Sequence, residues 1–369
     1  MLETSAKAYL ILENGTIFKG RAFGYSKEVT GELVFTTSVV GHQETISDPS
    51  YGGQLLMMTF PLIGNAGLNL EDMEAAHPRL RGLIVREKCD KPSNWRCELE
   101  MDGFMKQHKI TGIEGIDTRA LMRMLRDHGS MKAMITTRSP EGENPQLTKD
   151  QIQQKLTGIN NHNAVREATC QIPYTIEGTG KTMHVAVLDL GINNGSLEEL
   201  KRRGMRITVY PAYTDPAVIM QSNADGVFIS GGPGSPLDIP EIVENVKKLI
   251  AWKPVFGIGL GHQVIAQAMG CAVSRMKCGH HGSNYPVKDL QSGKVYITNQ
   301  NTDYTVSQSP EDVIVTFRNV NDGATEGIAH RTKPVFSVQF RPETASNPCH
   351  TGFVYDQFQT LMEGGKLNA

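Results

Sequence analysis

Apolar and polar residues alternate in the first part of the chain as they do in β-strands. Residues 8–20 (AYLILENGTIFKG) contain two apolar runs on either side of Asn14-Gly15, a dipeptide that strongly indicates a β-hairpin turn. Further strand-like runs occur at residues 31–40 and 53–64. These patterns predict several short strands in the N-terminal part of the chain.

A helical pattern follows at residues 116–129 (IDTRALMRMLRDHG), where apolar residues share one face. Asp117 is the expected N-cap of this helix, and Gly129 is expected to end it. Strands followed by a helix predict a mixed α/β domain over residues 1–150.

A polar segment then connects this domain to the rest of the chain. Residues 151–182 are rich in polar residues and glycine, and we interpret them as a linker region. The sequence predicts one short helix here, near Thr148 to Leu156.

From Met183 onward, strand-like runs alternate with amphipathic helical segments. The strand-like runs are residues 184–191, 206–212, 225–232 and 254–259, and the helical segments are residues 196–204 and 240–252. Ser196 is the expected cap of the first of these helices. The alternation predicts an α/β domain over residues 183–369 with a doubly wound, mainly parallel sheet and helices on both faces.

Two glycine-rich corners follow strands of this predicted sheet. They are residues 231–234 (GGPG) and 257–261 (GIGLG). Ligands of such sheets bind beyond the carboxyl ends of the strands, so both corners are candidates for a binding site.

Composition narrows the kind of protein. The chain has 369 residues, of which 39% are hydrophobic, so it can bury the cores of two domains. The net charge of −2, without a long run of one sign, argues against a nucleic-acid partner or a basic membrane-binding face. No apolar run approaches the ~20 residues that span a bilayer, and the N-terminus lacks the layout of a signal peptide. We therefore expect a cytoplasmic protein.

The cysteines indicate neither a disulfide framework nor a metal site. None of them forms a C-x-x-C pair, and in a cytoplasmic chain they are expected to be reduced thiols. They are Cys89, Cys97, Cys170, Cys271, Cys278 and Cys349.

The second glycine corner, within residues 255–266 (VFGIGLGHQVIA), has the pattern of a strand that turns sharply into a helix. A catalytic nucleophile often occupies the centre of such an elbow, with small residues two positions away on each side. Here the centre is Gly259, which has no side chain. A dinucleotide-binding loop would need a glycine where His262 stands, and residues 178–182 (GTGKT) lack the first glycine of a Walker loop. A phosphate loop is therefore disfavoured.

Motifs along nearly the whole chain point to one family. The N-terminal motifs are GELVFTTSVVGHQETISDPSYGGQ, PLIGNAGLN, RGLIVREKCDKPSNW and GIEGIDTRALMR. The C-terminal motifs are DGVFISGGPGSP, PVFGIGLGHQ, HHGSNYPVKDL, VYITNQN and KPVFSVQFRPE. Together and in this order, they resemble the small subunits of carbamoyl-phosphate synthetase, in which a class I glutamine amidotransferase domain follows a small-subunit N-terminal domain.

This resemblance implies an activity and a partner. Small subunits of the family hydrolyse glutamine and pass the ammonia through a tunnel to an ATP-dependent large subunit, which makes carbamoyl phosphate for arginine or pyrimidine synthesis. The N-terminal domain packs on that large subunit. A cysteine thiolate attacks the glutamine amide, activated by a histidine that a glutamate orients. The resemblance implies no cofactor in this chain, because ATP and magnesium are expected only on the large subunit.

The resemblance places the family's nucleophile at Gly259, its histidine at Arg341 and its glutamate at Glu343. Only the glutamate is retained. Glycine offers no nucleophile, and arginine, with a pKa above ~12, cannot act as a general base at neutral pH. We expect Arg341 to form an ion pair with Glu343 that closes the vacated site, and His262 to pack or cap at the start of the helix.

The resemblance also assigns a glutamine pocket. Its positions are Ser50, Gly232, Gly234, Leu260, Gln263, Asn301, Asp303 and Tyr304. Most of them match the family. However, the family usually has Gln-Asn-His-Gly where this chain has Gln300-Asn301-Thr302-Asp303, so an aspartate replaces a glycine whose backbone lines the pocket.

Changes in nucleophile, base and pocket together predict that glutaminase activity is lost, and that the chain is a structural or regulatory partner of the large subunit. Two alternatives stay open. The chain could be a non-catalytic module that binds glutamine or another amino acid, or a glutaminase with a displaced cysteine. Cys278 and Cys349 each stand near a histidine, but neither lies on the elbow, and an ordinary loop thiol is the simpler interpretation.

Overall fold

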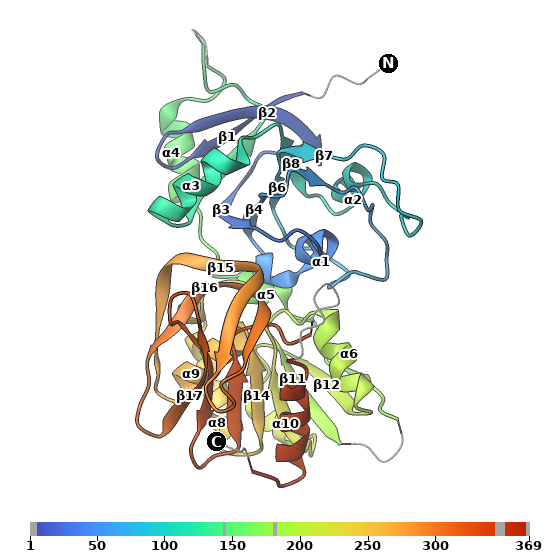
Figure 1. Ribbon diagram of the computed structural model, residues 1–369, viewed down its shortest axis with the longest axis vertical. Coiled ribbons are helices and arrows are strands. Elements are labelled where there is room, and N and C mark those ends of the chain that lie inside the picture. Colours follow the sequence, from blue (N-terminus) through green and yellow to red (C-terminus); the bar gives the residue numbers. More distant parts are fainter. Residues whose placement is uncertain (1–5, 143–144, 180–182, 344–350, 367–369) are drawn as a thin grey trace. The chain divides into compact units, whose positions relative to one another are not determined.

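The computed structural model describes residues 6–142, 145–179, 183–343 and 351–366, and the chain divides into two compact units (Figure 1). Unit 1 comprises Met1–Asn161 and Lys277–His281, and unit 2 comprises His162–Met276 and Gly282–Ala369. The main division, after Asn161, falls inside the segment predicted to connect the domains. In the part of the chain that the structure describes, no helix is both long and apolar enough to cross a membrane.

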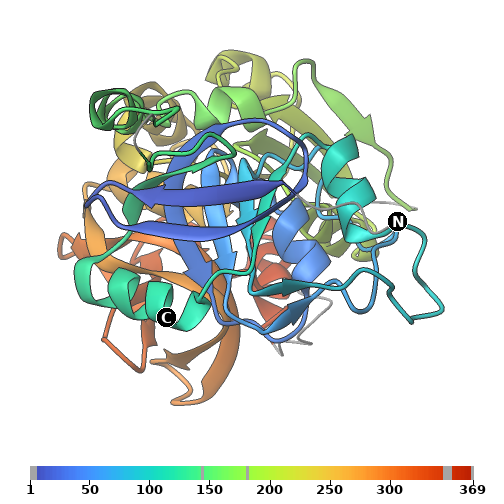
Figure 2. The ribbon, with the colours of Figure 1, turned by 90° about the horizontal axis from the view of Figure 1, so that it is seen from above.

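Unit 1 is built on a closed barrel in which parallel and antiparallel strands are mixed. Around the barrel the order is β1 (Lys7–Leu12), β2 (Ile17–Gly24), β8 (Thr111–Glu114), β6 (Gly82–Ile84), β4 (Gln54–Met58), β3 (Val29–Thr36) and β9 (Met131–Thr136). A small separate sheet pairs β5 (Leu62–Ile63) with β7 (Glu87–Lys88). Figure 2 shows the β1–β2 hairpin in dark blue.

The predicted hairpin is confirmed, because β1 and β2 pair in antiparallel register around Asn14-Gly15. Gly15 has a φ of 85°, a left-handed conformation that glycine adopts without a steric penalty. Neighbouring residues of the strands face opposite sides: Leu33 packs in one hydrophobic cluster and Val34 in another. This is the two-residue period of a strand that is buried on both faces.

Helices cover this barrel. They are α1 (His42–Ser47), the 3-10 turn η1 (Pro49–Tyr51), α2 (Met101–Gln107), α3 (Thr118–His128) and α4 (Lys149–Thr157). The predicted ends of α3 are confirmed: the Asp117 carboxylate accepts a hydrogen bond from the Ala120 amide at 3.0 Å, and Gly129 ends the helix at a φ of 89°. The short helix predicted near Thr148 is also confirmed as α4, with the Thr148 side chain as its cap.

Unit 2 is built on one long sheet. Its strand order is β10 (Tyr174–Ile176), β12 (Arg206–Pro211), β11 (His184–Asp189), β13 (Gly226–Ile229), β14 (Val255–Ile258), β19 (Val335–Val338), β18 (Thr325–His330), β17 (Val313–Asn319), β15 (Ala272–Asp289) and β16 (Val295–Gln308). The strands from β12 to β19 in this order are parallel, and antiparallel strands extend the sheet on both sides.

Helices pack on both faces of this sheet, which confirms the predicted α/β, doubly wound architecture. The helices of unit 2 are α5 (Ala164–Ala168), α6 (Asn194–Arg202), α7 (Pro216–Met220), the 3-10 turn η2 (Pro236–Asp238), α8 (Pro240–Ile250), α9 (Leu260–Ala268) and α10 (Phe353–Met362). Apolar residues of α7, α8 and α9 share one cluster with the sheet, and those of α6 and α10 share the other. Figure 1 shows α6 and α10 in front of the parallel strands.

One predicted helix cap is wrong. Asn193, not Ser196, caps α6: its side chain accepts a hydrogen bond from the Ser196 amide at 2.9 Å. Ser196 lies inside the helix, where its hydroxyl donates instead to the carboxylate of Glu343 at 2.9 Å. The preceding Asn193 supplies the cap, and the Ser196 hydroxyl serves a distant acceptor.

The aromatic cluster packed against α10 is expected to contribute to the stability of unit 2, and a substitution can test this. The buried ring of Phe256 stacks on Phe336, with centroids 4.6 Å apart, and meets Tyr355 edge-on at 5.4 Å. Phe256→Ala is expected to lower the free energy of unfolding by about 3–5 kcal/mol, because it leaves a cavity among rigid neighbours. Urea denaturation of this variant and of the exposed control Val320→Ala measures the effect. A loss for Phe256→Ala no larger than that of the control would contradict this account of the core.

Candidate functional site

The elbow predicted at the second glycine corner is present. β14 ends at Ile258, α9 begins at Leu260, and Gly259 between them has φ 54° and ψ −118°. A residue other than glycine rarely adopts this conformation except where surrounding structure holds it, as at active sites. The Gly259 amide donates to the Val338 carbonyl at 3.0 Å, which fixes the turn against the end of β19.

Close packing explains two of the three glycines of the elbow. A Cβ atom on Gly261 would lie 2.3 Å from the Ile229 carbonyl oxygen, and one on Gly257 would lie 2.5 Å from the Ile265 side chain. These glycines let α9 approach the strands closely. A Cβ atom on Gly259 would instead lie 3.5 Å from the Gly231 Cα, an ordinary van der Waals distance. The centre of the elbow thus has room for a Cβ atom, although the positive φ would strain a residue other than glycine there.

The first glycine corner lies beside the elbow, since Gly231 is the nearest neighbour of that missing Cβ. Gly232 lies against the residue that follows β11, since an added Cβ would be 2.1 Å from the Leu190 carbonyl oxygen. Gly234 has a φ of 89°. Backbone amides gathered at the carboxyl ends of β13 and β14 are the type of group that stabilises an oxyanion in acyl transfer.

Glu343 is held by a set of buried donors. Its Oε1 accepts from the Ser196 hydroxyl at 2.9 Å and from the side-chain Nδ2 of Asn193 at 3.1 Å, and its Oε2 accepts from the Tyr355 hydroxyl at 2.8 Å. Burial, together with the charge of Glu343, raises the pKa of Tyr355 well above its usual value. Tyr355 therefore stays protonated and remains a donor at neutral pH.

Arg341 forms the expected ion pair with this carboxylate. Its Nε lies 3.7 Å from Oε1 of Glu343, and both side chains are buried. The Arg341 amide donates to the Asn299 carbonyl at 2.9 Å, which anchors this part of the chain to β16. The glutamate thus has a permanently charged partner that cannot accept a proton.

Gln263, in the predicted glutamine pocket, is bonded within the protein. Its Nε2 donates to the Thr302 hydroxyl at 2.7 Å, to the Gln339 side chain at 2.9 Å and to the Tyr304 carbonyl at 3.3 Å. Thr302 is one of the residues that depart from the family pattern. The amide hydrogens of Gln263 are therefore already directed at acceptors of this chain.

The other pocket positions lie on three elements. Leu260 is the first residue of α9, and Asn301 and Asp303 lie on β16, where Asp303 is buried. Ser50 lies in η1 and belongs to unit 1, whereas the remaining candidates belong to unit 2. The Ser50 hydroxyl donates to the Asp48 carboxylate at 2.6 Å.

The histidine and cysteines near this region do not supply an obvious replacement nucleophile. Burial lowers the pKa of His262 to about 3, and its Nδ1 is hydrogen-bonded to the Ser337 hydroxyl at 2.9 Å, so it packs at the start of α9 as expected. Burial and Asp189 raise the pKa of Cys170 to about 12, and burial raises the pKa of Cys271 to about 11. These thiols are therefore protonated at neutral pH.

Cys278 and Cys349 are the two cysteines considered above as displaced nucleophiles. Cys278 lies in the part of β15 that groups with unit 1. Cys349 lies outside the described residues.

Sequence reasoning missed several residues that hold the site. Asn193, Ser196 and Tyr355 fix Glu343, and Gln339 binds Gln263. Their separations from these partners run from 12 to 150 residues along the chain. Asn193 and Ser196 both carried a local signal, as residue types that often cap helices, but that signal does not predict their contact with Glu343.

Comparison with known proteins identifies the family. The model described as "Carbamoyl-phosphate synthase small chain, CPSase domain" matches residues 10–135, and that of "Glutamine amidotransferase class-I" matches residues 186–361. The carbamoyl phosphate synthase small chain of Clostridium perfringens is 45% identical over 352 residues, which cover 95% of this chain and 98% of that protein. This chain belongs to the carbamoyl phosphate synthase small chain family.

Other small chains align over almost the full length. The carbamoyl phosphate synthase pyrimidine-specific small chain of Halalkalibacterium halodurans is 42% identical over 367 residues, covering 98% of this chain and 99% of that one. Among solved structures, a glutamine amidotransferase from Thermotoga maritima is 15% identical, with a TM-score of 0.38, and covers 50% of this chain and 90% of that one. Membership of a small-chain family implies a large-subunit partner.

The contrast between Gly259 and Gly261 is testable. Gly259→Ala is expected to cost about 1–2 kcal/mol, since only the positive φ opposes a side chain there. Gly261→Ala is expected to cost more, at the upper end of the about 1–3 kcal/mol typical of overpacking or beyond it, because backbone carbonyls must move. Thermal or urea unfolding of both variants measures the difference. An equal or larger loss for Gly259→Ala would show that the central glycine is required by packing.

Proposed function

We propose that this small chain has lost glutamine hydrolysis and acts as a structural or regulatory partner of an ATP-dependent large subunit that uses free ammonia. The observation that carries the proposal is Gly259: the elbow keeps its conformation and has room for a Cβ atom, but carries no side chain. Acyl transfer by this family's route begins with a covalent bond to a thiolate at that position.

The second reactive position supports the same conclusion. Arg341 stands where a general base would be needed, and Glu343 pairs with its guanidinium instead of orienting an imidazole. Removing a single triad nucleophile or base can lower kcat by about 10⁶-fold. With both absent, oxyanion donors have no tetrahedral intermediate to stabilise, because none forms.

The departures from the family pattern in the predicted glutamine pocket agree with a site that does not hydrolyse glutamine. The Gln263 amide is bonded to Thr302 and Gln339, so an incoming glutamine would have to compete with those acceptors. The buried carboxylate of Asp303 would favour a ligand with an amine or guanidinium over a neutral amide. Binding of another amino acid without hydrolysis is therefore a second candidate function, compatible with the first. Calorimetry against amino acids that shows no heat would remove it.

The decisive measurement is carbamoyl phosphate formation by this chain mixed with a large subunit, with glutamine or ammonium as the nitrogen donor. We expect synthesis with ammonium, and a rate with glutamine about 10³-fold lower or undetectable. The large subunit alone is the control that reveals any stimulation by this chain.

Glutamine-dependent synthesis, together with glutamate release, would contradict the loss of glutaminase. Thiol alkylation would then test the displaced-cysteine alternative. Activity abolished by Cys278→Ala or Cys349→Ala would identify the nucleophile.

A further inference from the structure

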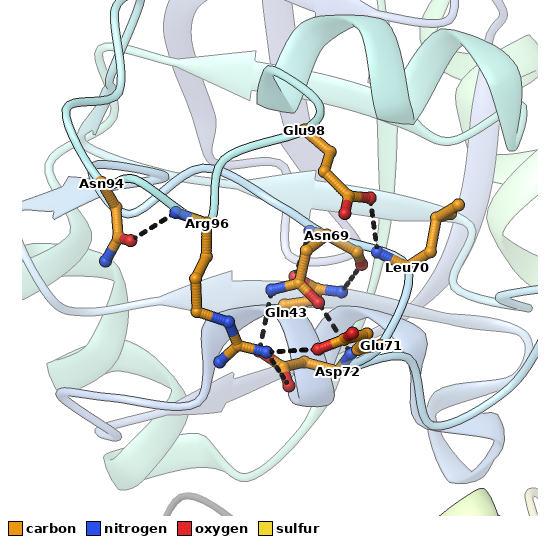
Figure 3. A network of polar contacts seen from close by, with 8 residues as sticks. All are labelled: Gln43, Asn69, Leu70, Glu71, Asp72, Asn94, Arg96 and Glu98. Atoms are coloured by element: carbon orange, nitrogen blue, oxygen red, sulfur yellow. Dashed lines mark hydrogen bonds and ion pairs between the residues drawn. The ribbon is translucent and has the colours of Figure 1, made fainter.

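Two of the cavities formed by described residues lie outside the candidate site, one within each unit. In the cavity of unit 1, polar side chains bond one another (Figure 3). The Gln43 side chain accepts from the Asn69 backbone amide at 2.9 Å, and the Asn69 side chain donates to the Asp72 carboxylate at 2.8 Å. Arg96 donates to the same carboxylate at 3.0 Å. Because these polar groups are directed at one another, they do not indicate a ligand.

The cavity of unit 2 has a volume of about 230 Å³. It is bounded by strands β15, β17, β18 and β19, by the turn after β15, and by α10. Neither Glu343 nor any position of the predicted glutamine pocket lines it. An apolar cavity of about 150 Å³ is enough to hold benzene, so this one has room for a ring with a substituent.

A small residue within a row of large ones explains the hollow. The row consists of residues paired directly across four neighbouring strands: Ile314, Ala329, Phe336 and Phe256. Directly paired residues face the same side of a sheet. Ala329 therefore leaves a gap between Ile314 and Phe336. Helix α10 packs at the other end of the row, where the ring of Tyr355 lies 5.4 Å from that of Phe256.

Aromatic rings form the walls of this cavity. Phe336 stacks on Phe256 with centroids 4.6 Å apart, and Phe317 meets Phe340 edge-on at 5.3 Å. Both lining rings, those of Phe336 and Phe317, are buried and held by these neighbours. Binding therefore does not require the walls to become ordered, which favours affinity. Their flat faces and edges favour an aromatic ligand.

Uncharged polar side chains complete the cavity. Gln357 and Thr316 line it, and their side chains have no hydrogen-bonding partner in the part of the chain that the structure describes. The charged lining residue is Asp289, whose carboxylate accepts from the Gln291 amide at 2.9 Å and from the Ser292 hydroxyl at 2.6 Å. Asp289 thus stabilises the turn after β15, and its negative charge disfavours an anionic ligand.

We propose that this cavity is a binding site for a small uncharged aromatic molecule that carries one hydrogen-bonding group. The ring lies against Phe336 and Phe317, over Ala329, and its polar group bonds to the amide of Gln357. The site is separate from the proposed loss of glutamine hydrolysis, and neither proposal depends on the other.

The first test is a calorimetric titration of the full-length chain with phenol, with benzoate as the anionic probe and toluene as the probe that lacks a hydrogen-bonding group. Phenol is expected to bind with a Kd of about 1 mM or below, which is within the limit for a ligand of its size. Benzoate is expected to bind at least about tenfold more weakly, because Asp289 repels it. Benzoate binding as tight as that of phenol would overturn the assigned ligand class.

Variants then locate the site. Ala329→Leu fills the gap and is expected to raise the Kd for phenol by about tenfold or more. Gln357→Ala is expected to raise it by about two- to tenfold, the effect of one hydrogen bond, and to leave the Kd for toluene unchanged. Leu290→Ser changes a lining residue that is 44% exposed, and it is expected to weaken phenol binding even if Ala329→Leu does not fold. The matched control is Leu237→Ser, a 56% exposed leucine outside the cavity, which is expected to leave Kd unchanged.

Circular dichroism and urea unfolding verify that each variant folds. Phenol binding that is unchanged in folded Ala329→Leu, or in Leu290→Ser, would show that phenol binds elsewhere and would overturn the site. The absence of binding by the unaltered chain at about ten times the expected Kd would do the same. An equal loss of phenol and toluene binding in Gln357→Ala would contradict the hydrogen bond assigned to that amide.

Discussion

The close approach of α9 to the neighbouring strand governs the geometry of unit 2. Gly261 brings the first turn of this helix to within contact of the Ile229 and Ser230 carbonyls, a distance that no side chain would allow. Because the helix starts there, Gly259 must turn sharply between strand and helix, and the Gly231 corner must lie beside it. The elbow is therefore a consequence of packing, and it persists without the nucleophile that such elbows present.

Glu343 is likewise fixed by contacts that hold the fold together. Its donors come from the start of α6 and from α10, and Arg341 lies beside it, so the carboxylate links separate elements at the end of the sheet. Removing one partner of a buried charged cluster leaves an uncompensated charge, which is strongly destabilising. Glu343 therefore has a structural role in this buried cluster.

The two units differ in how their polar and apolar side chains are arranged. Unit 2 carries a site whose polar groups are directed at one another, as with Gln263 and Thr302. Unit 1 carries an ordered polar network that leaves apolar side chains exposed at its edge. The polar groups of the first site bond within the protein, whereas exposed apolar groups on ordered loops favour association.

The sequence by itself determined the features that depend on neighbouring residues. The turn at Gly15, the cap at Asp117 and the strand-helix alternation of unit 2 follow from local conformational preference and hydrophobic period. The absence of a nucleophile at Gly259 is likewise a matter of residue type. Only the tertiary structure decided that Asn193 caps α6 and that Gln263 bonds Gln339. It also joined the carboxylate of Asp72 to the guanidinium of Arg96, 24 residues away. These outcomes depend on partners far away in the chain, which the topology brings together and no local spacing encodes.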